Sequence, residues 1–321
     1  MNTNKPPRIT PRKRLRGALA PTVLRALRWL AERMSWQRAQ RSGARLGRIM
    51  RWCARHRVRQ ATHNLNLAFG DELPARQRTA IMLRAFESVG QLGLEMLKLP
   101  RMTPDSLAEI APIDGIEHLR AAREAGHGTI LVSAHLGNWE IMGVRLIHEG
   151  YPVVGLSRSS SDQRIARAVT GVRQELDADT IPVAGGIRPC LRLLNENGIL
   201  LIMPDRCARG QGLNVHFFGH RANIWHTPVL LSRRSHAALI PCHALRQPDG
   251  RFVVRLDPPL QLDATGDNER DLQVNTQRLF DHLEQLVRLY PEQYLWQYDL
   301  WSTVVRPTSS RSAPSNCAPA D

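Results

Sequence analysis

The 321-residue sequence has few cysteines, and none of them lies in a pattern that binds a metal. There is no Cys-x-x-Cys pair and no Cys/His cluster with zinc spacing among the five cysteines, at positions 53, 190, 207, 242 and 317. An odd, scattered set of cysteines is typical of structural thiols in a reducing compartment. We therefore expect no metal site and a chain on the cytoplasmic side of a membrane.

Long hydrophobic runs are also absent. No run reaches the roughly 18 uncharged apolar residues that a spanning helix needs, although residues 17–34 come closest. No small-residue cleavage site follows this stretch, which argues against a removed signal peptide. The sequence also has no internal repeat and no glycine-rich phosphate-binding loop. Repeat architectures and nucleotide binding by such a loop are therefore not expected.

Acidic residues are scarce at the N-terminus. Residues 1–60, here called the basic arm, hold 17 Lys or Arg and one acid, Glu32, a balance of +16. The whole chain has a net charge of +15, so residues 61–321 are close to neutral. Basic arms bind nucleic acid, an anionic membrane or an acidic protein. The nearly neutral body argues against nucleic acid, because a nucleic-acid-binding domain carries its basic patch on its own folded face.

The basic arm also carries apolar residues at helical spacing. They recur every three or four positions between arginines, at Leu19, Val23, Leu24, Leu27, Trp29, Leu30, Met34, Leu46, Ile49, Met50 and Trp52. This pattern favours an amphipathic helix that lies in the headgroup layer of an anionic membrane. A helix packed on the domain with a solvated outer face remains the alternative. The sequence also leaves open whether 17–34 spans the membrane or lies on it.

Beyond the basic arm, the hydrophobic pattern predicts alternating strands and helices. A periodic apolar face predicts a helix over 76–99. Short apolar runs predict strands at 129–134, 153–156, 181–183, 199–203, 238–243 and 252–256, with helices at 161–176, 187–197, 227–236 and 270–289. The alternation predicts an α/β fold with a central, mostly parallel sheet flanked by helices. We expect one domain over 61–305 and, from its Ser/Pro/Ala composition, a disordered tail over 306–321.

A histidine and a glutamate five residues apart follow the first predicted strand. The strand ends at Ala134, and His135 opens a turn that leads into a helix containing Glu140. In open α/β sheets, ligands bind at the carboxyl ends of strands. His135 and Glu140 can meet only if the histidine is in the loop and the glutamate in the first helical turn. Such a pair suits a general base oriented by a carboxylate. The spacing alone also fits a histidine that merely caps a helix.

Further short motifs occur in a fixed order along the chain. They are Asn64-Leu65…Phe69, Phe86…Gly90…Glu95, the block His135-Leu-Gly-Asn-Trp-Glu140, Arg158, Arg173, Gly185-Gly186-Ile-Arg188, Met203-Pro204-Asp205, Phe217-Phe218-Gly219, Thr227-Pro228 and Pro291-Glu-Gln-Tyr-Leu-Trp296. From about residue 17 to 305 the chain resembles the bacterial lipid A late acyltransferases (lauroyl/myristoyl acyltransferases), within the wider H-x4-D/E lysophospholipid acyltransferases. The resemblance implies a glycerolipid acyltransferase-like fold with an N-terminal amphipathic, membrane-associated helix.

The resemblance also implies the roles of the site residues. His135 would be the general base and Glu140 its orienting partner, with Arg158, Arg173 and Asp205 lining the site. Arginine suits an anionic head group because its planar fork holds phosphate with two hydrogen bonds. As a separate hypothesis, Asn138 and the amides after His135 would stabilise the oxyanion of the tetrahedral intermediate.

The expected reaction moves a fatty acyl group from an acyl thioester, acyl carrier protein or CoA, to a hydroxyl of a lipid A precursor or related glycolipid. No serine or cysteine lies in a nucleophile elbow, so the acceptor would attack directly, without a cofactor. The enzyme would be peripheral or monotopic, at the cytoplasmic face of the inner membrane. An acidic carrier protein would also be attracted to the basic arm.

Three departures from the family pattern leave the acceptor open. Ser-Ser-Ser-Asp follows Arg158, Gln-Tyr-Asp-Leu-Trp follows Trp296, and Arg206 stands where Gln or His is usual. Alternative acceptors are an amino-lipid, a phosphatidylinositol mannoside or a lysophospholipid. A non-catalytic protein that binds membranes or nucleic acid is the alternative from another class.

Overall fold

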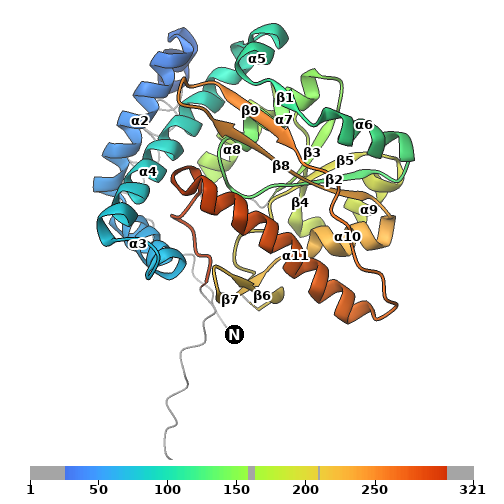
Figure 1. Ribbon diagram of the computed structural model, residues 1–321. Coiled ribbons are helices and arrows are strands. Elements are labelled where there is room, and N and C mark those ends of the chain that lie inside the picture. Colours follow the sequence, from blue (N-terminus) through green and yellow to red (C-terminus); the bar gives the residue numbers. More distant parts are fainter. Residues whose placement is uncertain (1–25, 158–162, 209, 302–321) are drawn as a thin grey trace, which may run out of the picture.

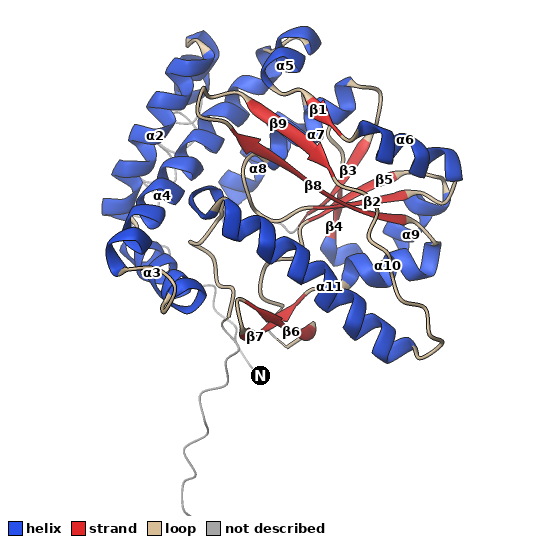
Figure 2. Cartoon of the chain, viewed as in Figure 1, coloured by secondary structure: helices blue, strands red, loops and turns tan. Residues whose placement is uncertain are grey.

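A computed structural model describes residues 26–157, 163–208 and 210–301, and side chains are described except over 163–168. It shows a central sheet with helices on both faces (Figure 1). The cartoon coloured by secondary structure shows the long helix α11 (Asn268–Leu289) crossing in front of the sheet, with α7 (Trp139–His148) and α8 (Gln163–Gln174) behind it (Figure 2). This is the α/β layer arrangement that the alternating pattern predicts.

The central sheet has seven strands in the order β1-β9-β8-β2-β5-β3-β4. Their bounds are β1 (Ile113–Asp114), β2 (Thr129–Val132), β3 (Val153–Ser157), β4 (Thr180–Pro182), β5 (Ile199–Ile202), β8 (Ala238–Arg246) and β9 (Phe252–Leu256). Strand β2 is parallel to both of its neighbours, with Thr129 opposite Ile199 of β5 and Ala238 of β8. Only the β8–β9 pair is antiparallel in this sheet as described. The prediction of a mostly parallel sheet is confirmed.

Helices cover the two faces of the sheet. Besides α7, α8 and α11 they are α2 (Trp36–Cys53), α3 (Arg55–Phe69), α4 (Ala75–Lys98), α5 (Pro104–Ile110), α6 (Ile116–Ala125), α9 (Arg188–Asn195) and α10 (Thr227–Ser235). Three 3₁₀ turns lie at Leu99–Arg101, Val183–Gly185 and Pro291–Gln293, and a separate hairpin is formed by β6 (Leu213–Phe217) and β7 (His220–Ile224).

The alternation of side chains along β2 divides the core into two halves. Ile130 and Val132 pack in one hydrophobic cluster, with residues of α3, α4, α9, α10 and α11. Leu131 packs in the other cluster, on the opposite face, with residues of α5, α6 and α7. Because successive side chains of a strand point to opposite faces, an all-apolar strand such as β2 is buried on both sides. The ends of β2 and its neighbours are therefore held rigidly.

Part of the basic arm is built into the folded body. Helix α2 packs along α4 so closely that a Cβ on Gly47 would lie 2.1 Å from the carbonyl oxygen of Phe86. Gly90 is equally constrained, since its Cβ would lie 2.2 Å from the carbonyl oxygen of Gly43. Glycines on both helices let the backbones approach. Helix α2, which makes up residues 36–53 of the basic arm, is thus packed against α4 of the predicted domain.

The first described residues also contact the domain. Residues 26–33 are helical, and Arg28 bonds to Glu32 and to Glu175 next to α8. Within the described ranges, no helix is long and apolar enough to cross a bilayer. Residues 17–25 of the expected amphipathic stretch 17–34, and the expected tail at 306–321, lie outside the described residues.

Candidate active site

His135 lies just beyond the carboxyl end of β2, next to the carboxyl end of β5. The two strands are parallel and in register, so they end at the same edge of the sheet. The amide of Ser133 donates to the carbonyl of Ile202 at 3.1 Å, which carries the pairing up to the turn. The segments that follow, His135 from β2 and Asp205 from β5, therefore meet. This is the strand-end position at which α/β sheets bind ligands.

Asp205 forms two hydrogen bonds with His135. The ring Nδ1 of His135 lies 2.6 Å from Oδ1 of Asp205, and the backbone N–H of His135 donates to Oδ2 at 2.8 Å. The aspartate side chain is only 1% exposed, whereas the histidine side chain is 15% exposed. One carboxylate thus fixes both the ring and the backbone of the same residue.

The charge state of Asp205 decides the tautomer of His135. Burial raises the pKa of this carboxyl, but the His135 charge and hydrogen bonds outweigh it, and the pKa is lowered overall. An ionised carboxylate only accepts hydrogen bonds, so Nδ1 carries the proton and Nε2 is left as a base. Burial and the charge of Asp205 also raise the pKa of Tyr294 well above its usual value, which keeps that hydroxyl neutral.

Glu140, expected to orient His135, forms its hydrogen bonds with Arg173 and Trp139 and not with the imidazole. Glu140 accepts two hydrogen bonds from Arg173, from Nε at 3.0 Å and from one terminal nitrogen at 2.5 Å. Among the described residues, the ring partner of His135 is Asp205, with no hydrogen bond to Glu140. The physical reason is the parallel pairing of β2 and β5, which places a buried carboxylate beside the ring before the helix begins.

Glu140 is connected to His135 through Trp139. The indole Nε1–H of Trp139 donates to Glu140 at 3.0 Å, and the indole ring packs edge-to-face on the imidazole with centroids 5.1 Å apart. The pKa of Arg173 is raised because its bonds to Glu140 outweigh burial, which lowers it. Arg173, Glu140 and Trp139 thus form one wall beside the histidine, and the fork of Arg173 is occupied by a carboxylate.

The turn after His135 is held by its own backbone. The amides of Leu136, Gly137 and Asn138 donate to the carbonyls of Ala134, Gln293 and Ala244, at 2.7, 3.1 and 2.9 Å. Gly137 has a φ of +63°, and a Cβ there would lie 2.0 Å from the carbonyl oxygen of Ala244. These amides are already engaged, so the hypothesis that they stabilise an oxyanion is not supported.

Asn138 is a structural residue of this turn. Its side chain is fully buried, and its Oδ1 accepts from the amide of Ile141 as the N-cap of α7. Its Nδ2 donates to Glu95, a buried carboxylate that also accepts from Gln40 and twice from Arg246. Asn138 does not line the cavity. Its hydrogen bonds anchor the His135 turn to α4 and β8.

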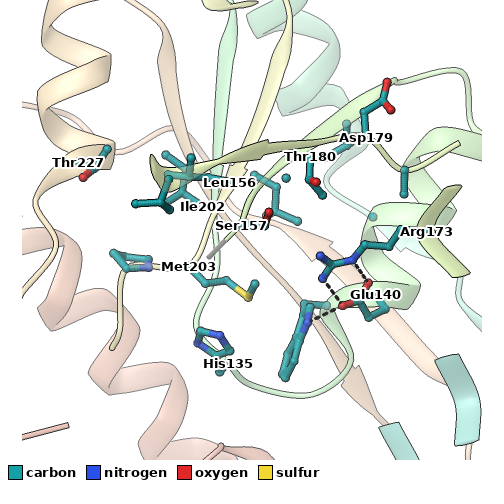
Figure 3. A pocket seen from close by; sticks show the side chains of 18 of the residues that line it. His135, Glu140, Leu156, Ser157, Arg173, Asp179, Thr180, Ile202, Met203 and Thr227 are labelled. Carbon is teal, nitrogen blue, oxygen red and sulfur yellow. Dashed lines mark hydrogen bonds and ion pairs between the residues drawn. The ribbon is translucent and has the colours of Figure 1, made fainter. Parts of the chain in front are cut away.

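A cavity of about 500 Å³ opens beside His135. Its walls are mostly apolar and come from α7, β3, α8, β5 and the segments before β4 and α9; they include Val144, Ile147, Val153, Leu156, Val169, Ala178, Val183, Ile187, Leu201 and Ile202. Its polar groups lie both near the histidine and farther away, at Ser157, Asp179, Thr180 and Thr227 (Figure 3). The picture shows His135 on one side, with the Arg173–Glu140 pair facing the cavity on the other. The volume is within the roughly 300–1,000 Å³ of small-molecule sites.

The structure adds residues that the sequence reasoning did not select. Trp139, Arg206 and Tyr298 line the cavity, the last two from segments that depart from the family pattern. The departures from the family pattern were the sequence signal that could have identified Arg206 and Tyr298. No such signal pointed to Arg57, which contacts Tyr298. Arg158 lies outside the described residues. No cluster of three His, Cys, Asp or Glu suited to a metal ion occurs in the part of the chain that the structure describes.

Comparison with known proteins gives the family. The model of a family described as bacterial lipid A biosynthesis acyltransferase matches residues 14–303. The chain belongs to this family. The resemblance drawn from the motifs is confirmed, and the chain is an acyltransferase.

Relatives in the acyltransferase family carry two kinds of name. A phosphatidylinositol mannoside acyltransferase of Mycobacterium tuberculosis is 29% identical over 85% of this chain and 86% of its own length. One from Mycolicibacterium smegmatis is 28% identical over 71% and 74%. The lipid A biosynthesis lauroyltransferase of Escherichia coli is 23% identical over 86% and 89%. The activity is thus an acyl transfer of the lipid A or phosphatidylinositol mannoside type.

Proposed function

We propose that this acyltransferase moves a fatty acyl group from a thioester of acyl carrier protein or CoA to a hydroxyl of a phosphate-bearing glycolipid, with His135 as the general base. The observation that carries the proposal is the pair of hydrogen bonds between His135 and Asp205 at the edge of a largely apolar cavity. A base held in one tautomer beside an apolar cavity is what acyl transfer to a hydroxyl requires.

The reaction proceeds by direct attack. Nε2 of His135 takes the proton of the acceptor hydroxyl while its oxygen bonds to the thioester carbonyl carbon. The tetrahedral intermediate then collapses, the carbon–sulfur bond breaks, and the thiolate takes the proton from Nε2. Asp205 remains ionised and stabilises the imidazolium between these steps, as the carboxylate does in a Ser-His-Asp triad. An ester and a free thiol result, and the base is regenerated.

Glu140 and Arg173 affect the base, His135, through Trp139. Their bidentate pair fixes the Trp139 indole, which packs on the imidazole and limits its rotation. Glu140 is therefore a positioning residue, and the Glu140–Arg173 pair neutralises both charges beside the apolar wall. In this proposal the glutamate of the His-x4-Glu motif shapes the pocket, and Asp205 assists the proton transfer.

The apolar wall receives the acyl chain. Ile147 and Val153 contribute to it from α7 and β3. A chain bound there would place its carbonyl near His135, with the thioester sulfur towards solvent. The free energy of burying each methylene is about 0.8 kcal/mol, enough to make the cavity select among chain lengths.

Two acceptor types remain candidates, and each has an observation in its favour. The family is described by lipid A biosynthesis, whereas the relatives with 28–29% identity are named for phosphatidylinositol mannoside. Both acceptors are glycolipids that carry phosphate and a free hydroxyl. The His135–Asp205 site serves either, so the choice depends on the groups that bind the head.

The enzyme works at a membrane surface in this proposal. The end of α2 exposes an apolar tip, defined by Ile49, Met50 and Trp52, which are 60%, 39% and 73% exposed. The guanidinium of Arg51 lies 4.8 Å from the Trp52 ring centroid, and further arginines surround the tip. An apolar tip among cations suits insertion into an anionic leaflet, here the cytoplasmic face of the inner membrane.

Reconstitution with defined substrates tests the function. Purified full-length protein receives labelled acyl carrier protein or CoA thioesters with either glycolipid, and mass spectrometry identifies the product. We expect one acceptor to gain a single acyl ester, and His135→Ala to lose about 10²–10⁴-fold in kcat. His216→Ala, an exposed histidine of β6, is the matched control and keeps its activity. Full turnover in a folded His135→Ala protein excludes the mechanism.

A further inference from the structure

Two arginines from distant parts of the chain stack on one tyrosine near His135. The guanidinium carbon of Arg206 lies 3.8 Å from the ring centroid of Tyr298, and that of Arg57 lies 4.9 Å from it. Arg206 directly follows Asp205, and Arg57 lies in the first turn of α3. Cation–π contacts at these distances hold both guanidinium groups in place without using their hydrogen-bond donors.

The segment that carries Tyr298 is held in place by hydrogen bonds to its backbone carbonyls. Nδ2 of Asn64 donates to the carbonyls of Trp296 and Tyr298, at 2.8 and 2.6 Å. One terminal nitrogen of Arg57 donates to the carbonyl of Gln297 at 2.9 Å. Helix α3 thus holds the segment that carries Tyr298, and the arginine–tyrosine–arginine stack is preorganised.

These arginines keep donors available for an anion. Within the described ranges, Arg206 and Arg57 have no carboxylate partner. Arg206 is exposed and lines the cavity, so its guanidinium is accessible to a ligand there. Arg173, by contrast, has its fork occupied by Glu140. A fixed guanidinium without a carboxylate partner is suited to bind phosphate through two hydrogen bonds.

The stack lies within reach of the reacting atoms. The centroid of Tyr298 is 6.3 Å from that of His135, so the guanidinium carbon of Arg206 lies no more than about 10 Å from the imidazole. In a glycolipid, a phosphate and a hydroxyl on the same or an adjacent sugar ring are separated by a comparable span. In a carrier-protein or CoA donor, the whole pantetheine arm separates phosphate from thioester. The distance therefore favours the acceptor.

We propose that Arg206 and Arg57, held by Tyr298, form the subsite for the phosphate group of the glycolipid acceptor. The inference rests on the proposed acyl transfer and names the group by which the acceptor is recognised. Arg57 lies five residues after Trp52 of the apolar tip, in the first turn of the helix that follows α2. The phosphate would be bound at the membrane side of the cavity while the hydroxyl reaches His135.

The test compares an acceptor with its phosphate-free analogue. Arg206→Gln should raise KM for the phosphate-bearing glycolipid by roughly 10–100-fold, the range for losing a charged hydrogen bond. KM for the same glycolipid without phosphate, and the rate of donor thioester hydrolysis, should stay within about twofold. Arg221→Gln, an exposed arginine of β7 outside the cavity, is the matched control.

Substitutions of the ring separate the stack from a direct contact. Tyr298→Phe keeps the aromatic face and should retain the KM for the phosphate-bearing acceptor, whereas Tyr298→Leu should raise it as Arg206→Gln does. Equal losses on both acceptors in the Arg206 variant, or an effect confined to donor hydrolysis, would overturn the subsite. Acyl transfer to the phosphate-free acceptor by these variants would still support the proposed function, whereas an unaltered enzyme that acylates neither acceptor would refute that function instead.

Discussion

Asp205 bonds to both the imidazole and the backbone amide of His135, although 70 residues separate them in sequence. The two contacts act differently. The ring contact sets the tautomer, and the amide contact holds the backbone at the end of β2, so substitutions of Asp205 can separate orientation from charge.

Asp205→Asn should reduce kcat by roughly 10²–10⁴-fold with a small change in KM for the acyl donor. An asparagine keeps an oxygen for the backbone amide, but its NH₂ group would face Nδ1 and favour the unproductive tautomer. The pH dependence of kcat, measured for both proteins, checks the role. If Asp205→Asn retains normal kcat and pH profile, the aspartate does not control the base.

Glu140→Gln should lower activity less than Asp205→Asn, because Glu140 acts through Trp139. Removing one partner leaves Arg173 without its carboxylate, so the free energy of unfolding should fall by about 1–3 kcal/mol. The double variant Glu140→Gln/Arg173→Gln should lose less than the sum of the singles, by about 0.5–3 kcal/mol. Denaturant unfolding measures this coupling.

Trp139→Phe is the companion variant for the Glu140 prediction. It removes the indole N–H while keeping an aromatic ring, so it should reproduce part of the kcat loss of Glu140→Gln. Two results together would contradict the indirect role of Glu140. They are a kcat loss in Glu140→Gln as large as that in Asp205→Asn, in a protein of normal stability, and full activity of Trp139→Phe.

Trp52→Ser should weaken binding to vesicles that contain anionic lipid by about tenfold, because it removes the most exposed apolar side chain of the α2 tip. Leu289→Ser, which alters a 71% exposed leucine at the end of α11, is the matched control and should bind normally. Flotation at two salt concentrations separates insertion from charge attraction. Equal binding by wild type and Trp52→Ser would exclude the tip as the anchor.

Stability should fall as the pH is lowered from about 6.5 towards 4, partly because of His243. Burial lowers the pKa of this histidine to about 4; Asp257 raises it, whereas Arg255 and His282 lower it further. In that window the unfolded chain binds a proton that the folded chain does not, so the free energy of unfolding drops as pH falls, by up to about 3 kcal/mol. His243→Gln should flatten the slope, measured by unfolding at several pH values. An unchanged slope would show that the pH dependence lies elsewhere.

The sequence was most informative where local pattern and sheet geometry coincide. Short apolar runs such as 129–134 and 199–203 predicted the strands, and parallel pairing brought His135 and Asp205 to one edge. The partner of Glu140 was not predictable in this way. Arg173 comes from α8, and its distance from the glutamate depends on how two helices pack.

The basic arm shows a second limit of pattern reasoning. The charges and the apolar spacing of residues 36–53 correctly predicted that part of this helix is exposed, since Trp52 and Ile49 are exposed. The same pattern could not predict that Gly43 and Gly47 lie against α4 and so join the helix to the domain. A helix can be amphipathic towards solvent and still belong to the core through small residues.

The contacts of Asn64 join residues separated by 232 and 234 positions, so the active site is complete only after residues 296–298 have been added to the chain. A nascent chain that has emerged only as far as β9 already holds His135 and Asp205, but lacks the segment that carries Tyr298 and closes the His135 turn. Contacts of such long range also form late in folding. The base and its carboxylate partner are therefore synthesised well before Tyr298, the residue on which Arg57 and Arg206 stack, and the site is completed last.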